Sequence, residues 1–380
     1  MILGIDASNI KTGGGLTHCL EIINNKSYID SGFEKVVIWS NKNTLDKIID
    51  DKSIIKKTSY LLNKNFLIRA LWNLFFLKNE LIKENCRAVF ILGGYSFTNF
   101  KPMITISHNL LPFSPIEIKN YGFSLQATKL RLLSFFLKNT FNKCDGLIYL
   151  SQYASSIIHK QLKKSVVSTV IGHGINKSFY NNKKVIQKPI TKYSYEKPIK
   201  AIYVSTIDMY KHQWNVAKAI EKLRCNGYPI TIDFIGGNYY HALKKFNKSI
   251  KKIFKNREFI KYHGEISYNK PNEYYNKSDL IIFASSCENL PIIVLECMAT
   301  GLPIVSSSCG PMPEILKNNV QYFDPYKVDS IYNAVKSDLD DHINREINVK
   351  KLIEDSKKYD WTKVSKDTFN FIFRIVESKK

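Results

Sequence analysis

Residues 280–307 read LIIFASSCENLPIIVLECMATGLPIVSS, and this stretch decides the fold class. The apolar run 280–284 predicts a buried strand, Ile292–Ala299 predicts a helix, and 303–306 predicts a second strand. Pro291 fits the first turn of that helix, where its missing N–H costs no hydrogen bond. A strand, a helix and a strand in this order indicate a parallel βαβ unit.

The same alternation extends in both directions along the chain, which predicts an α/β protein with two domains. A polar segment with two prolines, 183–198, interrupts it and is expected to be a linker. We therefore expect one domain at 1–182, a second at 199–360, and a C-terminal helix at 361–380 that crosses back to the first. The other expected strands are 2–6, 35–39, 88–92, 103–106, 146–150, 166–171, 201–205, 230–235 and 259–262, and helices are expected at 16–23 and 215–226.

Composition narrows the class of protein. The chain has 380 residues, of which 44% are hydrophobic, so it can build packed cores and is not expected to be disordered. No apolar run reaches the roughly 18–20 residues of a spanning helix, and the first residues, MILGIDASNI, do not resemble a secretory signal. The seven cysteines are scattered without a CxxC pair, which favours reduced thiols and a cytoplasmic location.

The net charge of +23 points to a polyanionic partner or to an AT-rich gene that favours lysine. The excess is larger in the first half of the chain. Two segments there, 61–83 and 129–143, combine leucines and aromatic residues with lysine and arginine. Such segments are typical either of ordinary core helices or of helices that lie on an anionic membrane.

Two glutamates eight residues apart, Glu288 and Glu296, carry the strongest chemical signal. Glu288 follows a strand, whereas Glu296 lies among apolar residues inside the predicted helix, where a buried carboxylate needs a donor such as a sugar or ribose hydroxyl. Lys211 lies between a predicted strand and helix, where it is either simply solvated or a fixed charge for a phosphate.

Weaker signals come from the first half. Gly13, Gly14 and Gly15 are expected in a loop, 11–15, that lets the backbone approach a ligand, although a plain tight turn has the same pattern. His108 follows a predicted strand, and His173 lies between two glycines; each is either structural or a ligand contact. No metal-ligand spacing is recognisable, so no metal is expected.

Together these residues resemble the retaining glycosyltransferases of family 4, which have the GT-B fold. The resemblance implies two Rossmann-like domains that face a central cleft. It implies that Glu288 contacts the donor sugar, that Glu296 holds the ribose, and that Lys211 and His108 act at the reacting groups. The remaining residues implied to bind the donor are Gly14, Gly15, Ser205, Gly236, Gly237, Gly264, Glu265, Ile266, Asn289, Leu290, Pro291 and Ile292. One departure is that Thr206 and Tyr210 stand where many members have an arginine beside the lysine.

The resemblance also implies the co-substrate and partners. We expect a UDP- or GDP-linked sugar as donor, no cofactor, and a retaining, metal-independent transfer to a glycan acceptor. The basic segments favour a polyprenyl-diphosphate-linked acceptor on the inner face of the plasma membrane, as in bacterial O-antigen or capsule synthesis. The alternatives are a nucleotide-sugar epimerase of the same fold and a polyanion-binding protein; no nucleic-acid module is recognisable.

Overall fold

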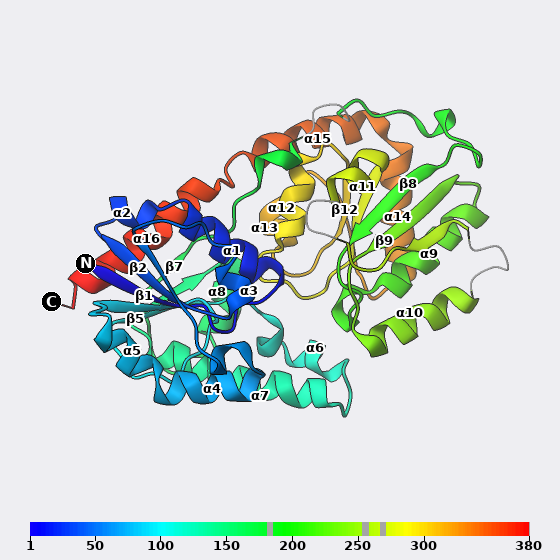
Figure 1. The fold of residues 1–380 in the computed structure, drawn as a ribbon. Helices are drawn as coiled ribbons and strands as arrows, with labels where there is room; N and C mark the ends of the chain where they lie inside the picture. The colour runs from blue at the N-terminus through cyan, green and yellow to red at the C-terminus, as the bar shows by residue number, and fades with distance from the viewer. Residues whose placement is uncertain (181–184, 253–257, 267–270, 380) are drawn as a thin grey trace. The chain divides into compact units, whose positions relative to one another are not determined.

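The computed structural model describes residues 1–180, 185–252, 258–266 and 271–379, and the chain forms two compact units (Figure 1). The first unit comprises Met1–Ile118, Phe123–Gly174 and Tyr359–Lys380. The second comprises Lys119–Gly122 and Ile175–Lys358. The expected linker, 183–198, is part of the second unit, and its first two residues lie outside the described residues.

The first unit is built on a parallel sheet whose described part has seven strands in the order β3-β2-β1-β4-β5-β6-β7. Its central strands are buried over nearly their whole length, as the continuous apolar runs predict for a sheet covered on both faces. The strands are β1 (Ile2–Asp6), β2 (Lys35–Trp39), β3 (Ile54–Lys57), β4 (Ala88–Ile91), β5 (Met103–Ile106), β6 (Gly146–Tyr149) and β7 (Ser168–Val170).

Helices cover this sheet, and the last helix of the chain is one of them. Helix α16 (Trp361–Glu377) packs against α1, α2 and β6, so the two ends of the chain lie in one unit (Figure 1). The other helices of this unit are α1 (Gly13–Asn24), α2 (Ser27–Asp30), α3 (Lys42–Leu45), α4 (Phe66–Phe75), α5 (Leu77–Lys83), α6 (Pro115–Lys119), α7 (Leu125–Lys143) and α8 (Gln152–His159).

The second unit repeats the same plan with a parallel sheet of order β10-β9-β8-β11-β12-β13 among its described residues. The two sheets confirm the prediction of two Rossmann-like α/β domains. The strands are β8 (Ile199–Val204), β9 (Ile230–Ile235), β10 (Ile260–Tyr262), β11 (Leu280–Phe283), β12 (Ile304–Ser307) and β13 (Gln321–Phe323). The helices are α9 (Gln213–Cys225), α10 (Tyr240–Lys252), α11 (Pro271–Lys277), α12 (Ile292–Ala299), α13 (Met312–Leu316), α14 (Val328–Asp340) and α15 (His342–Ser356).

Two strands were missed and two local predictions were wrong. Strands β3 and β13 lie at sheet edges and are only four and three residues long, so their apolar signal is weak. The expected glycine loop 11–15 is shorter than predicted, because helix α1 already begins at Gly13 and includes Gly14 and Gly15. Pro291 is the residue before helix α12 rather than a member of its first turn.

Candidate functional site

In each sheet, the chain adds strands first toward one edge and then toward the other. In the second unit, this change occurs between the neighbouring strands β8 and β11. Ligands of open parallel sheets bind at the carboxyl ends of the strands at this point. Strand β8 leads to Ser205 and Thr206 and then to a short 3-10 helix, η6 (Met209–Lys211). The Asp208 carboxylate accepts a hydrogen bond from the Met209 N–H at 2.7 Å, which starts η6 and thereby fixes Lys211.

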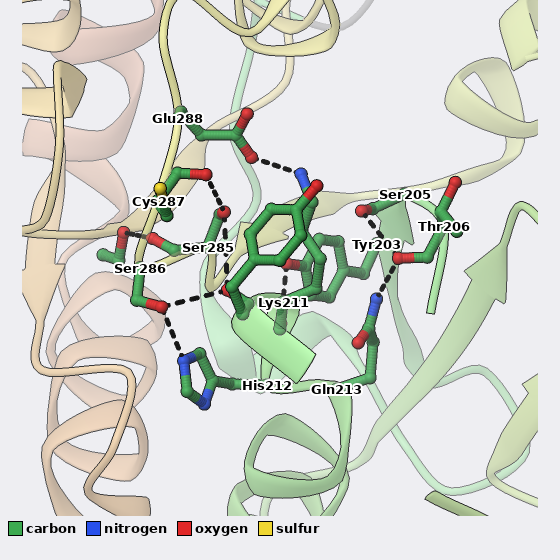
Figure 2. A network of polar contacts seen from close by, with 12 residues as sticks. Tyr203, Ser205, Thr206, Lys211, His212, Gln213, Ser285, Ser286, Cys287 and Glu288 are labelled. Atoms are coloured by element: carbon green, nitrogen blue, oxygen red, sulfur yellow. Dashed lines mark hydrogen bonds and ion pairs between the residues drawn. The ribbon is translucent and has the colours of Figure 1, made fainter. Parts of the chain in front are cut away.

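Hydrogen bonds join the loop after β8 to the loop after β11 (Figure 2). The Ser286 N–H donates to the Tyr210 carbonyl at 2.8 Å, and Ser286 Oγ lies 2.9 Å from His212 Nε2. His212 has φ of 52° and separates η6 from helix α9. These contacts hold the two loops in one arrangement.

Lys211 and Glu288 meet where these loops come together. Lys211 Nζ forms an ion pair with Glu288 Oε1, and only 9% and 13% of the two side chains is exposed (Figure 2). The Tyr203 hydroxyl donates to the Lys211 carbonyl at 2.8 Å, and the ammonium lies 5.0 Å from the Tyr210 ring centre. Burial raises the pKa of both phenols well above the usual value, and the Glu288 charge raises it further.

Glu296 is buried inside helix α12, with 5% of its surface exposed. Burial raises the pKa of its neighbour Cys297 to about 12, and the Glu296 charge acts in the same direction. The N–H groups of the first turn, at Ile292 and Ile293, have no partner inside the helix and can bind an anion. Asn289 and Leu290 are buried in the loop that leads to this turn.

The glycine turn after β9 completes this edge of the sheet. Gly236 has φ of 138°, and a Cβ there would lie 2.4 Å from the Ser205 carbonyl oxygen, so only glycine fits. Its N–H donates to the Gly264 carbonyl at 2.8 Å, which joins the turn to the loop after β10. Glu265 is exposed in that loop, and its Oε2 would lie 3.7 Å from a Cβ on Gly237. Ile266, the next residue, is half-buried.

Most of the expected residues of the second unit thus lie at the carboxyl ends of β8, β9, β10 and β11, whereas Ile292 and Glu296 lie in helix α12. The structure also adds residues that the sequence analysis missed. Gln213 is 1% exposed, and its amide donates to the Thr206 carbonyl at 3.0 Å. Gly310, in the loop after β12, lies against the Glu288 backbone: a Cβ there would be 3.5 Å from the Glu288 nitrogen. The one sequence signal for Gly310 is its position in a turn after the apolar run of β12. No feature of the sequence singles out Gln213.

In the first unit, His108 belongs to a cluster of buried rings. His18 Nδ1 lies 3.0 Å from His173 Nδ1, and the His18 and His108 ring centres are 4.9 Å apart. The Trp361 ring packs against His18 and His173. Burial lowers the pKa of His108 to about 4 and holds the pKa of His18 and His173 well below the usual value, so all three are neutral at pH 7. His18 was not singled out by its sequence context.

Among the described residues, no group of three or more histidine, cysteine, aspartate or glutamate side chains has an arrangement that could hold a metal ion. In the same part of the chain, no helix combines the length and the apolar character needed to cross a membrane.

Comparison with known proteins defines the class. Residues 186–358, which lie within the second unit, match the family of glycosyl transferases group 1. An Anabaena protein, HepE, solved in complex with UDP and glucose, superposes with a TM-score of 0.69 over 100% of both chains at 16% identity. The chain therefore has the two-domain GT-B fold of glycosyltransferases.

Two curated relatives are named as transferases. The sulfoquinovosyl transferase SQD2 of Arabidopsis thaliana is 27% identical over 195 residues, which is 49% of this chain and 36% of the relative. The O-antigen chain mannosyltransferase B of Escherichia coli is 26% identical over 112 residues, or 30% of this chain and 29% of the relative. The chain thus aligns with about a third of the length of these relatives.

Proposed function

We propose that this protein is a retaining glycosyltransferase of the family 4 type that moves a hexose-type sugar from a nucleotide diphosphate sugar to a glycan acceptor. The Lys211–Glu288 pair at the carboxyl ends of β8 and β11 carries the proposal. The pair supplies one cation and one carboxylate, both largely buried, and the Glu288 loop leads directly into helix α12.

The donor roles follow from the charges. A nucleotide diphosphate gains negative charge as it leaves the sugar, and Lys211 with the first-turn amides of α12 stabilises that charge without a metal ion or cofactor. Glu288, released from Lys211 when the diphosphate binds, accepts hydrogen bonds from the sugar hydroxyls. Glu296 accepts hydrogen bonds from the ribose, and the turns at Gly236 and Gly264 lie beside the UDP or GDP base.

Retention requires that the acceptor attacks from the side on which the nucleotide leaves. The acceptor oxygen bonds to the anomeric carbon, the bond from that carbon to the phosphate oxygen breaks, and the hydroxyl proton passes to the departing phosphate. His108 contacts the donor sugar in this proposal, and as a neutral imidazole it adds no charge. Trapping of a covalent bond between the sugar and a side chain would contradict the same-side route.

Helix α4 supports a lipid-linked acceptor because it exposes apolar residues and buries two polar residues beside Trp72. Leu71 and Phe75 on its outer side are 53% and 62% exposed, whereas Arg69 and Asn73 are buried. The Asn73 amide is held inward by a 2.6 Å hydrogen bond to Asp6. A helix that turns apolar residues to the solvent and polar residues to the core is typical of a surface that meets lipid or another protein.

Helix α7 adds positive charge to the same side of the unit. It carries four lysines and arginines and no acidic residue, and exposes Leu132 and Phe135. The ring of Tyr95 contacts Phe66 of α4 and Phe136 of α7, so the two helices are neighbours (Figure 1). An apolar surface edged by cations fits an anionic bilayer. We therefore propose a cytoplasmic enzyme, peripheral on the inner membrane face, that uses a polyprenyl-diphosphate-linked saccharide in O-antigen or capsule synthesis.

A donor screen tests the transferase proposal. UDP-, GDP- and dTDP-sugars are added to the purified protein, and the melting temperature is measured for wild type, Glu296→Ala and the exposed control Glu273→Ala. One donor should raise the midpoint of wild type and the control but not of Glu296→Ala, because a ligand stabilises only the state that binds it. A folded wild type that responds to no nucleotide sugar contradicts the proposal and favours a polyanion-binding protein. Isomerisation of the donor sugar without any acceptor favours an epimerase.

A further inference from the structure

The first unit has its own point where strand order changes, between β1 and β4, and the proposed function gives it no ligand. The loop after β1 contains Asn9 and Lys11, and the loop after β4 contains Gly93 and Tyr95. These loops touch: a Cβ on Gly93 would lie 2.9 Å from Asn9 Cβ. This edge is where an open parallel sheet binds its ligand.

Helix α4 places a buried cation at this edge. Arg69 is 8% exposed, and its Nη1 donates to the Lys64 carbonyl at 2.9 Å. Its buried Nε has no hydrogen-bond partner among the described residues. A buried guanidinium without a carboxylate partner is costly, so its position needs an explanation.

A second cation lies close to the first. Lys11 lies in the loop after β1; partial burial lowers the pKa of its ammonium, and the positive charge of Arg69 acts in the same direction. Within the described part of the chain, neither residue takes part in an ion pair. The carboxylate at the end of β1, Asp6, accepts hydrogen bonds from Asn73 and from the Ser8 N–H instead.

Neutral donors complete the cluster. Tyr95 is 3% exposed and its ring lies 5.9 Å from that of Phe66, one turn before Arg69 on helix α4. Its hydroxyl has no well-formed hydrogen bond among the described residues. Burial raises the pKa of the phenol, the Asp6 charge raises it further, and Arg69 and Asn9 offset part of that rise. Two cations, a phenol and an amide at the ligand-binding edge of a sheet form a site for an anion with several oxygens.

We propose that Arg69 and Lys11, with Tyr95 and Asn9, bind a phosphate group of the acceptor. This inference rests on the proposed function and specifies its acceptor as a phosphate or diphosphate ester. The apolar outer side of α4, which includes Leu71, belongs to the same helix as Arg69. A lipid diphosphate is therefore the acceptor class that fits both sides of α4: its phosphate would bind at Arg69, and its lipid would contact the apolar outer side.

Binding of three probes, measured by titration calorimetry without any nucleotide, tests the site. Farnesyl diphosphate combines lipid and diphosphate, inorganic pyrophosphate has only the charge, and farnesol has only the lipid. The variants are Lys11→Gln, Arg69→Gln, Arg69→Lys and Lys211→Gln, with the exposed Lys52→Gln as control on the first unit. Because charge-assisted contacts are strong, Lys11→Gln and Arg69→Gln should each bind farnesyl diphosphate about tenfold or more weakly, with Arg69→Lys intermediate.

The outcomes separate the sources of the anion. Farnesyl diphosphate bound more tightly than pyrophosphate supports a lipid-linked acceptor, and equal affinity supports a water-soluble phosphate ester. Unchanged affinity in Lys11→Gln, an exposed position whose replacement leaves the core intact, overturns the proposal. Loss of binding in Lys211→Gln alone overturns it as well, because the probe then occupies the donor site. The shift of the melting temperature by nucleotide sugars is measured in a separate experiment. Failure of the transferase proposal can therefore be distinguished from failure of the phosphate site.

Discussion

Lys211 and Glu288 form a largely buried ion pair although 77 residues separate them in the sequence. One lies at the end of η6 and the other in the loop after β11, and the hydrogen bonds between Tyr210 and Ser286 hold these segments together. The proposed donor roles require this pair to open, because its ammonium then meets the diphosphate and its carboxylate meets the sugar.

The first prediction concerns this pair. Lys211→Ala leaves the Glu288 carboxylate unpaired in a largely buried place, so the free energy of unfolding should fall by about 3 kcal/mol. Adding Glu288→Gln removes the unpaired charge, and the double variant should be more stable than Lys211→Ala alone. Urea unfolding measures both effects. Lys336→Ala, which breaks the exposed pair with Asp340, should leave the urea midpoint unchanged. Equal stability of the single and double variants would contradict the prediction.

The second prediction concerns the turn after β9. Gly236→Ala introduces a Cβ 2.4 Å from the Ser205 carbonyl at a φ of 138°, so the turn must move. Backbone strain of this kind costs about 1–3 kcal/mol, and the displaced turn should also weaken donor binding. Gly237→Ala is the matched control, because its nearest contact is 3.7 Å. Thermal melting with and without the donor distinguishes them; an equal response of the two variants would show that the turn does not hold the nucleotide.

The third prediction concerns pH and the histidine cluster. The pKa values of His18, His108 and His173 are lower in the folded protein than in the unfolded chain, so the unfolded chain binds more protons below about pH 6.5. Stability should therefore fall on acidification from pH 6.5, and the contribution of His108 should level off near its folded pKa of about 4. Each histidine contributes up to about 1.4 kcal/mol per pH unit.

His173→Asn tests this dependence by urea unfolding between pH 7 and pH 5. The variant should lose part of the slope of stability against pH, since one fewer imidazole takes up a proton on unfolding. His159→Asn, at an exposed position at the end of helix α8, is the control and should keep the slope of wild type. A wild-type stability that does not change over this range would refute the buried neutral cluster.

The fourth prediction concerns the outer side of helix α4. Wild type should bind vesicles of 30% phosphatidylglycerol in phosphatidylcholine, and Leu71→Gln with Leu74→Gln should weaken binding about tenfold, since each removes an exposed apolar side chain. Ile343→Gln, which removes an exposed isoleucine from the second unit, should not. Co-sedimentation measures binding. Membrane docking would be contradicted if wild type did not bind these vesicles at physiological salt. It would also be contradicted if the protein formed a dimer through Leu71.

The sequence by itself determined the elements and the class of fold. Apolar runs between turn residues located strands β1, β5 and β9 to the residue, because a strand that is buried over most of its length is largely apolar. Glu288 and Glu296 could also be recognised from the sequence as candidate site residues. Both lie in one local segment, in which strand β11 is followed by a loop and by helix α12. Edge strands β3 and β13 were not predicted, because only part of each strand is buried and its apolar pattern is short.

Only the tertiary structure decided which distant side chains meet and which helix face is covered. The pairing of Lys211 with Glu288, and of His18 with His173, depends on the order in which parallel strands lie side by side, which local patterns do not contain. The pattern of α4 predicts an amphipathic helix but not that its apolar side faces solvent. That orientation depends on Asp6, 67 residues away, whose hydrogen bond turns Asn73 and the polar side of α4 inward.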